Sequence, residues 1–94
     1  MSKLKILSWQ EIPSVVEAKD ASGSHKIQLS QKFQELIDLL AMRRGSAGTD
    51  NYLMEWHKEA QPDREGDAKT VAESLAAEIE ARYEQIKAEA LAKT

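Results

Sequence analysis

The spacing of apolar residues changes at Ser30, and that change most constrains what the chain can fold into. In the first third, residues 3–9 (KLKILSW), 14–20 (SVVEAKD) and 25–29 (HKIQL) show the alternation or the composition expected of β-strands. The glycine-containing turn at residues 21–24 (ASGS) predicts that the second and third strands form a hairpin. From Phe33 to Leu40, and again from Val71 to Ile86, apolar residues recur at three- and four-residue steps, which predicts α-helices.

Two helices are predicted in the remainder of the chain. The first begins after Ser30, a candidate N-cap, and ends before Gly45, with Arg43 and Arg44 beside the negative end of the helix dipole. Its apolar stripe consists of Phe33, Leu36, Ile37 and Leu40. The second helix is the longest predicted element and begins at about Asp67. Its stripe consists of Val71, Leu75, Ile79, Tyr83 and Ile86.

The segment between the helices has a weaker pattern. Residues 46–50 (SAGTD) predict a loop, and the alternation over residues 52–57 favours a strand, with a short helix capped by Thr49 as the alternative. Residues 61–66 (QPDREG) are predicted to interrupt regular structure. The predicted fold is therefore α+β: a small, mostly antiparallel sheet of three to four strands, covered on one face by two helices, in the order β-β-β-α-β-α.

Length and composition indicate a single domain and exclude several classes of function. The 94 residues predict a single domain, 1–94, with its core over about 3–87 and a frayed helix end at 88–94. The absence of cysteine excludes disulfides, thiolate catalysis and the common structural zinc sites. A net charge of −3 argues against a basic nucleic-acid footprint, and no apolar run is long enough for a signal peptide or membrane span. We therefore expect a soluble cytoplasmic protein that binds neither nucleic acid nor membrane.

One histidine has carboxylates at strand spacing. If residues 55–59 were a strand, Glu55, His57 and Glu59 would share a face, where they could perform acid–base chemistry or bind a divalent metal. The alternative is a solvated face, since charged side chains also protect an edge strand from aggregation. We predict no resident metal or other cofactor, and no catalytic residue is assigned.

The aromatic residues and one aspartate are candidates for a binding surface. Trp9, Tyr52 and Trp56 could frame a pocket or a partner-binding patch, although packing in the core is the alternative for both tryptophans. Asp38 lies beside the apolar stripe of the first helix, where partial burial would perturb its pKa; a solvated position is the alternative. No serine stands in a nucleophile-elbow context, and residues 45–49 (GSAGT) follow a helix and lack the lysine of a phosphate-binding loop.

Three segments together resemble a known family. Residues 9–13 (WQEIP), 28–45 (QLSQKFQELIDLLAMRRG) and 48–56 (GTDNYLMEW) are similar, in order and spacing, to the small domain family named for the conserved virulence factor C of staphylococci. In the larger proteins of that family the domain accompanies a NifU-like scaffold segment and helical repeats, whereas bacterial stand-alone relatives also occur, some beside corrinoid-dependent methyl-transfer enzymes. The positions that match the family's motifs include Trp9, Pro13, Asp38, Tyr52 and Trp56.

Two hypotheses follow. The resemblance and the missing catalytic constellation imply a small accessory or protein-interaction module, with a protein partner or a second copy of the chain as its target. The alternative is a metal-dependent or acid–base enzyme subunit that uses His57 with Glu55 and Glu59, in association with methyl-transfer enzymes. Under the leading hypothesis, the protein is not an enzyme.

Overall fold

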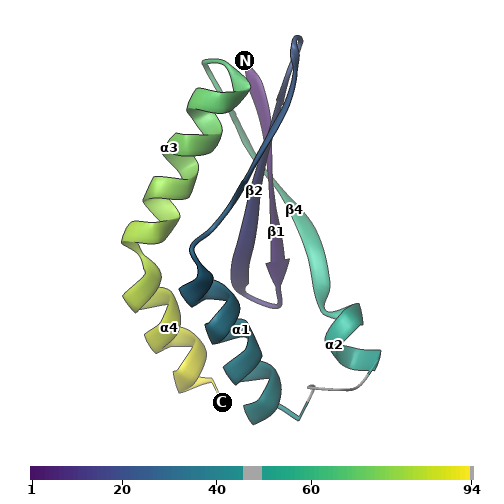
Figure 1. Cartoon of the computed structure of the whole chain (residues 1–94), viewed down its shortest axis with the longest axis vertical. Coiled ribbons are helices and arrows are strands. Elements are labelled where there is room, and N and C mark those ends of the chain that lie inside the picture. Colours follow the sequence, from purple (N-terminus) through teal and green to yellow (C-terminus); the bar gives the residue numbers. More distant parts are fainter. Residues whose placement is uncertain (46–49, 94) are drawn as a thin grey trace.

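The structure is a computed structural model that describes residues 1–45 and 50–93, without the side chains of residues 51 and 52. Three strands open the fold: β1 (Ser2–Trp9), β2 (Ile12–Asp20) and β3 (Gly23–Gln28). They are followed by α1 (Gln31–Arg43), α2 (Asp50–Met54), β4 (Trp56–Arg64), α3 (Ala68–Ala81) and α4 (Tyr83–Ala92). The predicted α+β class, with one small antiparallel sheet and helices packed on it, is confirmed (Figure 1).

The sheet has the order β3-β2-β1-β4, in which every neighbouring pair is antiparallel. The predicted hairpin connects β2 to β3, and its turn is closed by the Asp20 side chain, which accepts hydrogen bonds from the backbone N–H groups of Ser22 and Gly23 at 2.7 and 3.0 Å. Gly23 has φ 151°, which only glycine adopts without strain. The same Asp20 also accepts from the N–H of Ala68 and so ties the hairpin to the start of α3.

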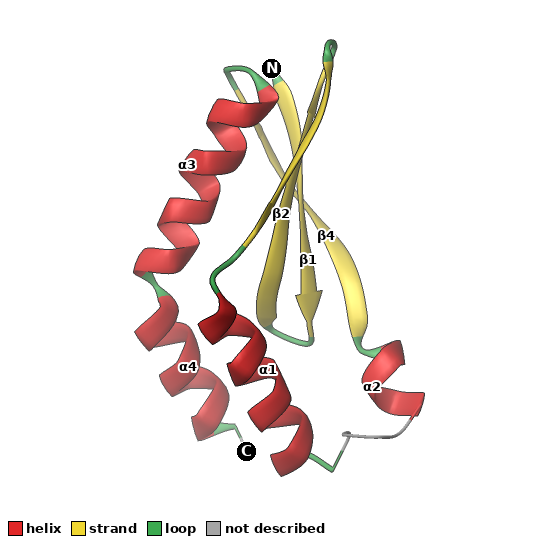
Figure 2. Cartoon of the chain, viewed as in Figure 1, coloured by secondary structure: helices red, strands yellow, loops and turns green. Residues whose placement is uncertain are grey.

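Helices α3 and α4 follow one another along one side of the sheet, and α1 lies beside α4 (Figure 2). Helix α3 packs against β1, β2 and β3, while α1 packs against β2. The helix-facing side of the sheet supplies Leu4, Val16 and Ala18 to the core. The helices supply buried residues from their predicted stripes, including Phe33, Leu36, Ile37, Leu40, Val71, Leu75 and Ile79.

The start and end of α1 differ in how well the sequence predicts them. The helix ends as expected, because Gly45 follows it with φ 73°, a left-handed conformation that terminates helices. Ser30 occupies the N-cap position, but its side chain does not cap α1. Instead, the N–H and hydroxyl of Ser30 donate to the two carboxylate oxygens of Glu80, at 2.8 and 2.7 Å. A side chain from α3 therefore holds the start of α1.

The predicted strand over residues 52–57 is wrong in its position. The short-helix alternative is observed at Asp50–Met54, although Thr49 lies outside the described residues, and the strand begins only at Trp56. The strand also continues into the predicted interruption at residues 61–66, as far as Arg64. It can do so because β4 is an edge strand with an irregular register opposite Ser2 and Leu4, so Pro62 does not interrupt a continuous ladder.

The predicted long C-terminal helix is interrupted at Arg82, which has φ −98° and ψ 4°. The break redirects the chain so that α4 packs against α1, and the rings of Tyr83 and Phe33 meet edge to face with centroids 5.0 Å apart. The core also extends beyond residue 87, where a frayed end is expected from sequence: α4 continues to Ala92 and Ala90 is completely buried.

Candidate interaction surface

Trp9 and Trp56 lie directly opposite each other on β1 and β4, but they are not equally accessible. Trp9 is completely buried, so its indole stabilises the fold and cannot contact a partner. Trp56 packs against the same core while part of its side chain remains exposed. Only Trp56 of the two can therefore belong to a binding surface.

The other positions shared with the family motifs are scattered. Pro13 is buried at the start of β2, where the register with β1 shifts. Asp38 is exposed on α1, and its carboxylate accepts a hydrogen bond from the side chain of Gln34 at 3.0 Å. The side chain of Tyr52 lies outside the described part of the structure. The candidates therefore do not form one common pocket among the described side chains.

His57 and Glu59 meet, whereas Glu55 participates through its backbone. The Nε2 atom of His57 lies 3.1 Å from a carboxylate oxygen of Glu59, and its Nδ1 atom lies 3.2 Å from the Glu55 carbonyl oxygen. Contact with this carbonyl, and then with the Glu59 carboxylate, raises the pKa of His57 above its ordinary value. The Glu55 carbonyl also accepts the backbone N–H of Gln10, which has a left-handed φ of 52°. Within residues 1–45 and 50–93, no three His, Asp or Glu side chains are grouped to hold a metal ion.

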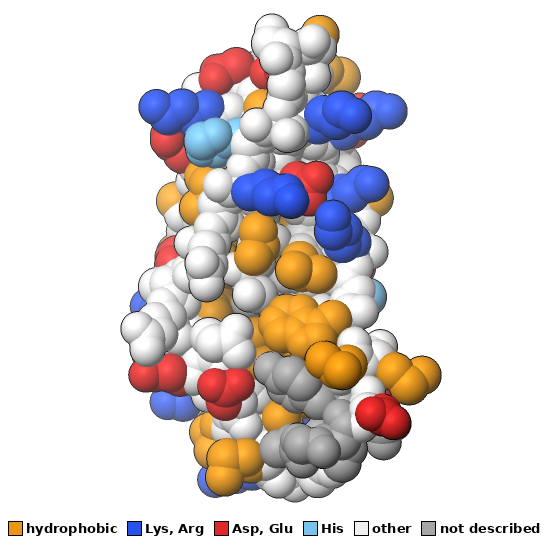
Figure 3. Space-filling model, turned by 45° about the vertical axis from the view of Figure 1, so that its right-hand side comes forward, with side chains coloured by type: hydrophobic (Ala, Val, Ile, Leu, Met, Phe, Trp, Pro, Cys, Tyr) orange, Lys and Arg blue, Asp and Glu red, His pale blue; other side chains and the backbone are white. Residues whose placement is uncertain are grey.

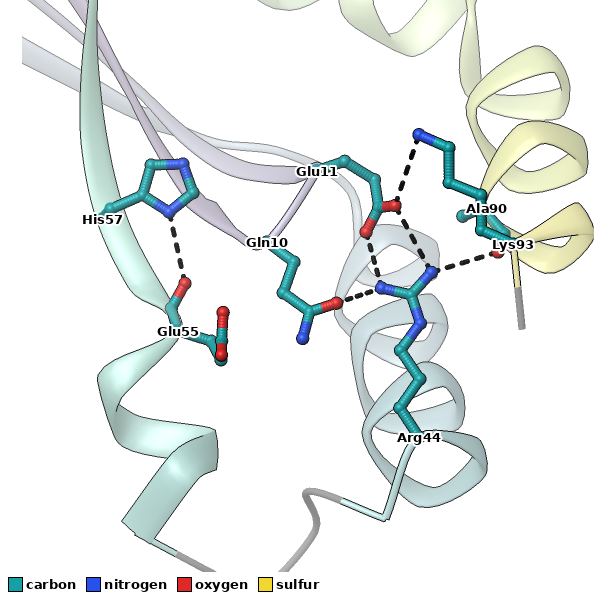
Figure 4. Close-up of polar contacts among 7 residues, drawn as sticks. All are labelled: Gln10, Glu11, Arg44, Glu55, His57, Ala90 and Lys93. Atoms are coloured by element: carbon teal, nitrogen blue, oxygen red, sulfur yellow. Dashed lines mark hydrogen bonds and ion pairs between the residues drawn. The ribbon is translucent and has the colours of Figure 1, made fainter.

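Arg44 joins three segments at the end of the molecule near the β1–β2 turn (Figure 4). Its guanidinium donates to both carboxylate oxygens of Glu11, at 2.7 and 3.3 Å, and to the Ala90 carbonyl at 3.1 Å; the Gln10 side chain is a further partner. The hydrogen bond from Arg44 lowers the pKa of Glu11, with the nearby Lys93 ammonium also contributing. The family-like segments at residues 9–13 and 28–45 thus meet here, and sequence reasoning missed this role because it assigned Arg44 only to the helix dipole.

The side of the sheet away from α3 carries a group of five lysines around one glutamate, which we call the lysine face. The strand registers place Lys3, Lys5 and Leu7 of β1 on this side, opposite Lys19, Glu17 and Val15 of β2. Lys26 of β3 pairs with Glu17, and Lys58 of β4 pairs with Leu7. The lysine face therefore consists of Lys3, Lys5, Glu17, Lys19, Lys26 and Lys58.

The charges of the lysine face interact with one another. The Lys58 ammonium lies 3.2 Å from a carboxylate oxygen of Glu17, and it lowers the pKa of Glu17 together with Lys26 and Lys5. Lys3 and Lys19 lie directly opposite each other, a like-charge pair that destabilises a sheet. The net charge of −3 thus conceals a positive face. The alternation of Lys3 with Lys5 and of Glu17 with Lys19 was the signal in the sequence that could have revealed it.

Exposed apolar side chains adjoin the lysine face. Leu53 and Met54 of α2 are 70% and 78% exposed, and they precede the partly exposed Trp56. Figure 3 shows Lys and Arg side chains over the upper part of this side of the molecule and hydrophobic side chains below them. The lysine face therefore adjoins exposed apolar area.

Comparison with known proteins identifies a family. The model of the family described as "Virulence factor" matches residues 7–92, which is nearly the whole chain. No curated protein and no solved structure matches this chain. No helix within the described ranges, 1–45 and 50–93, is long and apolar enough to cross a membrane.

Proposed function

The chain belongs to the virulence factor family, and from this premise we propose that it is a protein-interaction module whose lysine face binds an acidic surface of a partner protein. The observation that carries the proposal is the gathering of five lysines around Glu17 on the side of the sheet away from α3. Complementary charge attracts such a partner and orients it, while the apolar contact of Trp56, Leu53 and Met54 would slow its dissociation. The proposal places this role in a bacterial cytoplasm.

A protein fits this surface better than a nucleic acid does. Leu53 and Met54 offer apolar area without a ring on which a base could stack, and Trp56 packs part of its side chain against the core. The described part of the lysine face contains no arginine, the side chain that binds phosphate groups in a bidentate manner.

Crosslinking on the intact chain tests the proposal. A carbodiimide joins lysine amines directly to carboxylates that already touch them, so it should connect the lysine face to Asp or Glu residues of a host protein. The double variant Lys5→Glu, Lys19→Glu should lose this product, whereas the matched control Lys69→Glu, on the exposed side of α3, should retain it.

Three outcomes would overturn the proposal. Crosslinks that join two copies of this chain would show a homo-oligomer instead, and light scattering would then report the larger mass. A crosslinked product that is no longer recovered after nuclease treatment would show that nucleic acid occupies the lysine face. A crosslinked product that still forms with the double variant Lys5→Glu, Lys19→Glu would place the interface elsewhere.

A second candidate function rests on the 3.1 Å contact between His57 and Glu59. Their paired imidazole and carboxylate could move a proton or bind a divalent metal as part of an enzyme subunit. Calorimetric titration with zinc, manganese or nickel tests the metal version. An absence of heat at micromolar metal would remove it, and Glu59→Gln should abolish any binding that is seen.

A further inference from the structure

A cleft of about 270 Å³ lies on the other side of the sheet from the lysine face. It opens between β1, β4 and the joint of α3 and α4, and its apolar lining includes Ile6, Ile79 and Ile86. The cleft exists because the helix breaks at Arg82, so α4 turns toward α1 while β4 remains at the sheet edge. An apolar lining of this kind takes up an alkyl chain.

Ser8 gives the cleft an unused polar group. Its residue is only 6% exposed, and its side chain lines the cleft. Within the ranges 1–45 and 50–93, its hydroxyl makes no hydrogen bond to another residue, and no fully buried side-chain nitrogen or oxygen atom there lacks a partner, so this hydroxyl is reached from the open cleft. A hydroxyl in this position is available to a bound molecule.

The charge of the lining is mainly negative. Glu11, Glu59 and Glu89 contribute three carboxylates, against one guanidinium from Arg82. Arg44 neutralises Glu11 in part, and the side chain of Gln85 donates to Glu89 at 3.2 Å. Glu59 and Glu89 remain exposed and can accept further hydrogen bonds.

We propose that this cleft binds an ammonium group carried on a short alkyl chain. The chain lies against the isoleucines, the ammonium donates to the carboxylates of Glu59 and Glu89, and the Ser8 hydroxyl accepts or donates the remaining hydrogen bond. The ammonium comes either from a free aliphatic amine or from a lysine side chain of a protein. The proposal is independent of the lysine face, which lies on the opposite side of the sheet.

Three small ligands of equal chain length distinguish the contribution of charge to binding from the contribution of shape. In an NMR titration of the full chain, n-butylamine should shift the backbone amide signals of Ser8, Glu59 and Ile86, n-butanol should bind more weakly, and butyrate should not bind. Equal binding of all three probes, or shifts confined to the lysine face, would overturn the proposal. Titration with a glycine peptide that contains lysine identifies the source of the ammonium group. Tighter binding of this peptide than of n-butylamine indicates a protein side chain, and weaker binding indicates a free amine.

Two kinds of variant connect the binding to the named residues. Glu89→Gln should weaken n-butylamine about twofold to fivefold, as expected for an exposed ion pair, whereas Glu84→Gln on the same helix should not. Ser8→Ala should weaken it about twofold to tenfold, the value of one hydrogen bond, while leaving the midpoint of urea unfolding unchanged. Unchanged amine affinity in both Glu89→Gln and Ser8→Ala would exclude this cleft as the site.

Discussion

At the scale of single residues, Arg44 connects segments that lie far apart in the sequence. Its side chain is only 16% exposed, and it donates to Gln10, to Glu11 and to the Ala90 carbonyl. Because Arg44→Met leaves these acceptors without their donor, we expect it to lower the free energy of unfolding by about 2 kcal/mol, measured by urea denaturation. The control Arg43→Met, on the exposed neighbour, should change it by less than about 0.5 kcal/mol. Equal effects of the two variants would contradict this role.

The contact between Arg44 and Glu11 makes the stability of the fold depend on pH. Arg44 lowers the pKa of Glu11 in the folded chain, so the folded state gains stability above the ordinary glutamate pKa of about 4.3. That stability is lost as the pH falls through the lowered pKa. The difference in unfolding free energy between wild type and Arg44→Met should therefore shrink on acidification, and a constant difference would argue against the ion pair.

His57 has the opposite dependence on pH. Its pKa is raised by the Glu55 carbonyl and then by Glu59, so its contribution to stability is present below the ordinary histidine pKa and is lost as the pH rises through the raised value. Glu59→Gln should lower the His57 pKa, as followed by NMR titration of the imidazole signals. Glu84→Gln, which lies on α4 away from the histidine, should leave the titration unchanged. Identical curves for Glu59→Gln and wild type would contradict the contact.

At the scale of elements, α4 buries one of its sides and exposes the other. Ala90 is completely buried, while Ala88 of the same helix is exposed. Ala90→Leu should therefore destabilise the fold by about 1 to 3 kcal/mol through overpacking, whereas Ala88→Leu should be nearly neutral. Urea unfolding of both variants measures the difference. If Ala90→Leu were also neutral, the end of α4 would be frayed rather than packed.

At the scale of the whole molecule, the lysine face carries a cost in stability. Lys3 and Lys19 are directly opposed across β1 and β2, so Lys19→Glu replaces a like-charge pair by an opposite-charge pair. We expect this variant to stabilise the chain by about 0.2 to 1 kcal/mol at low salt and to bind the acidic partner more weakly. Thermal unfolding and carbodiimide crosslinking measure the two effects. A variant that is more stable and still fully crosslinked would show that the lysines serve solubility rather than binding.

The sequence by itself determined the class of fold and most of its elements. Alternation in residues 3–9 and the stripe from Phe33 to Leu40 are local patterns, and local periodicity directly reports which side of an element is buried. The turn before β3 and the end of α1 at Gly45 were also predictable, because both depend on the conformational freedom of glycine. The family resemblance was confirmed over residues 7–92.

Only the tertiary structure decided where β4 begins, where the long helix breaks and which residues share a surface. Residues 52–57 were too few to distinguish a strand from a helix, and pairing with β1 began only at Trp56. No glycine or proline marks Arg82, so the break depends on the fit of α4 to α1. The lysine face depends on strand order, which brings lysines from four segments together, and strand order is set by long-range pairing that no local pattern contains.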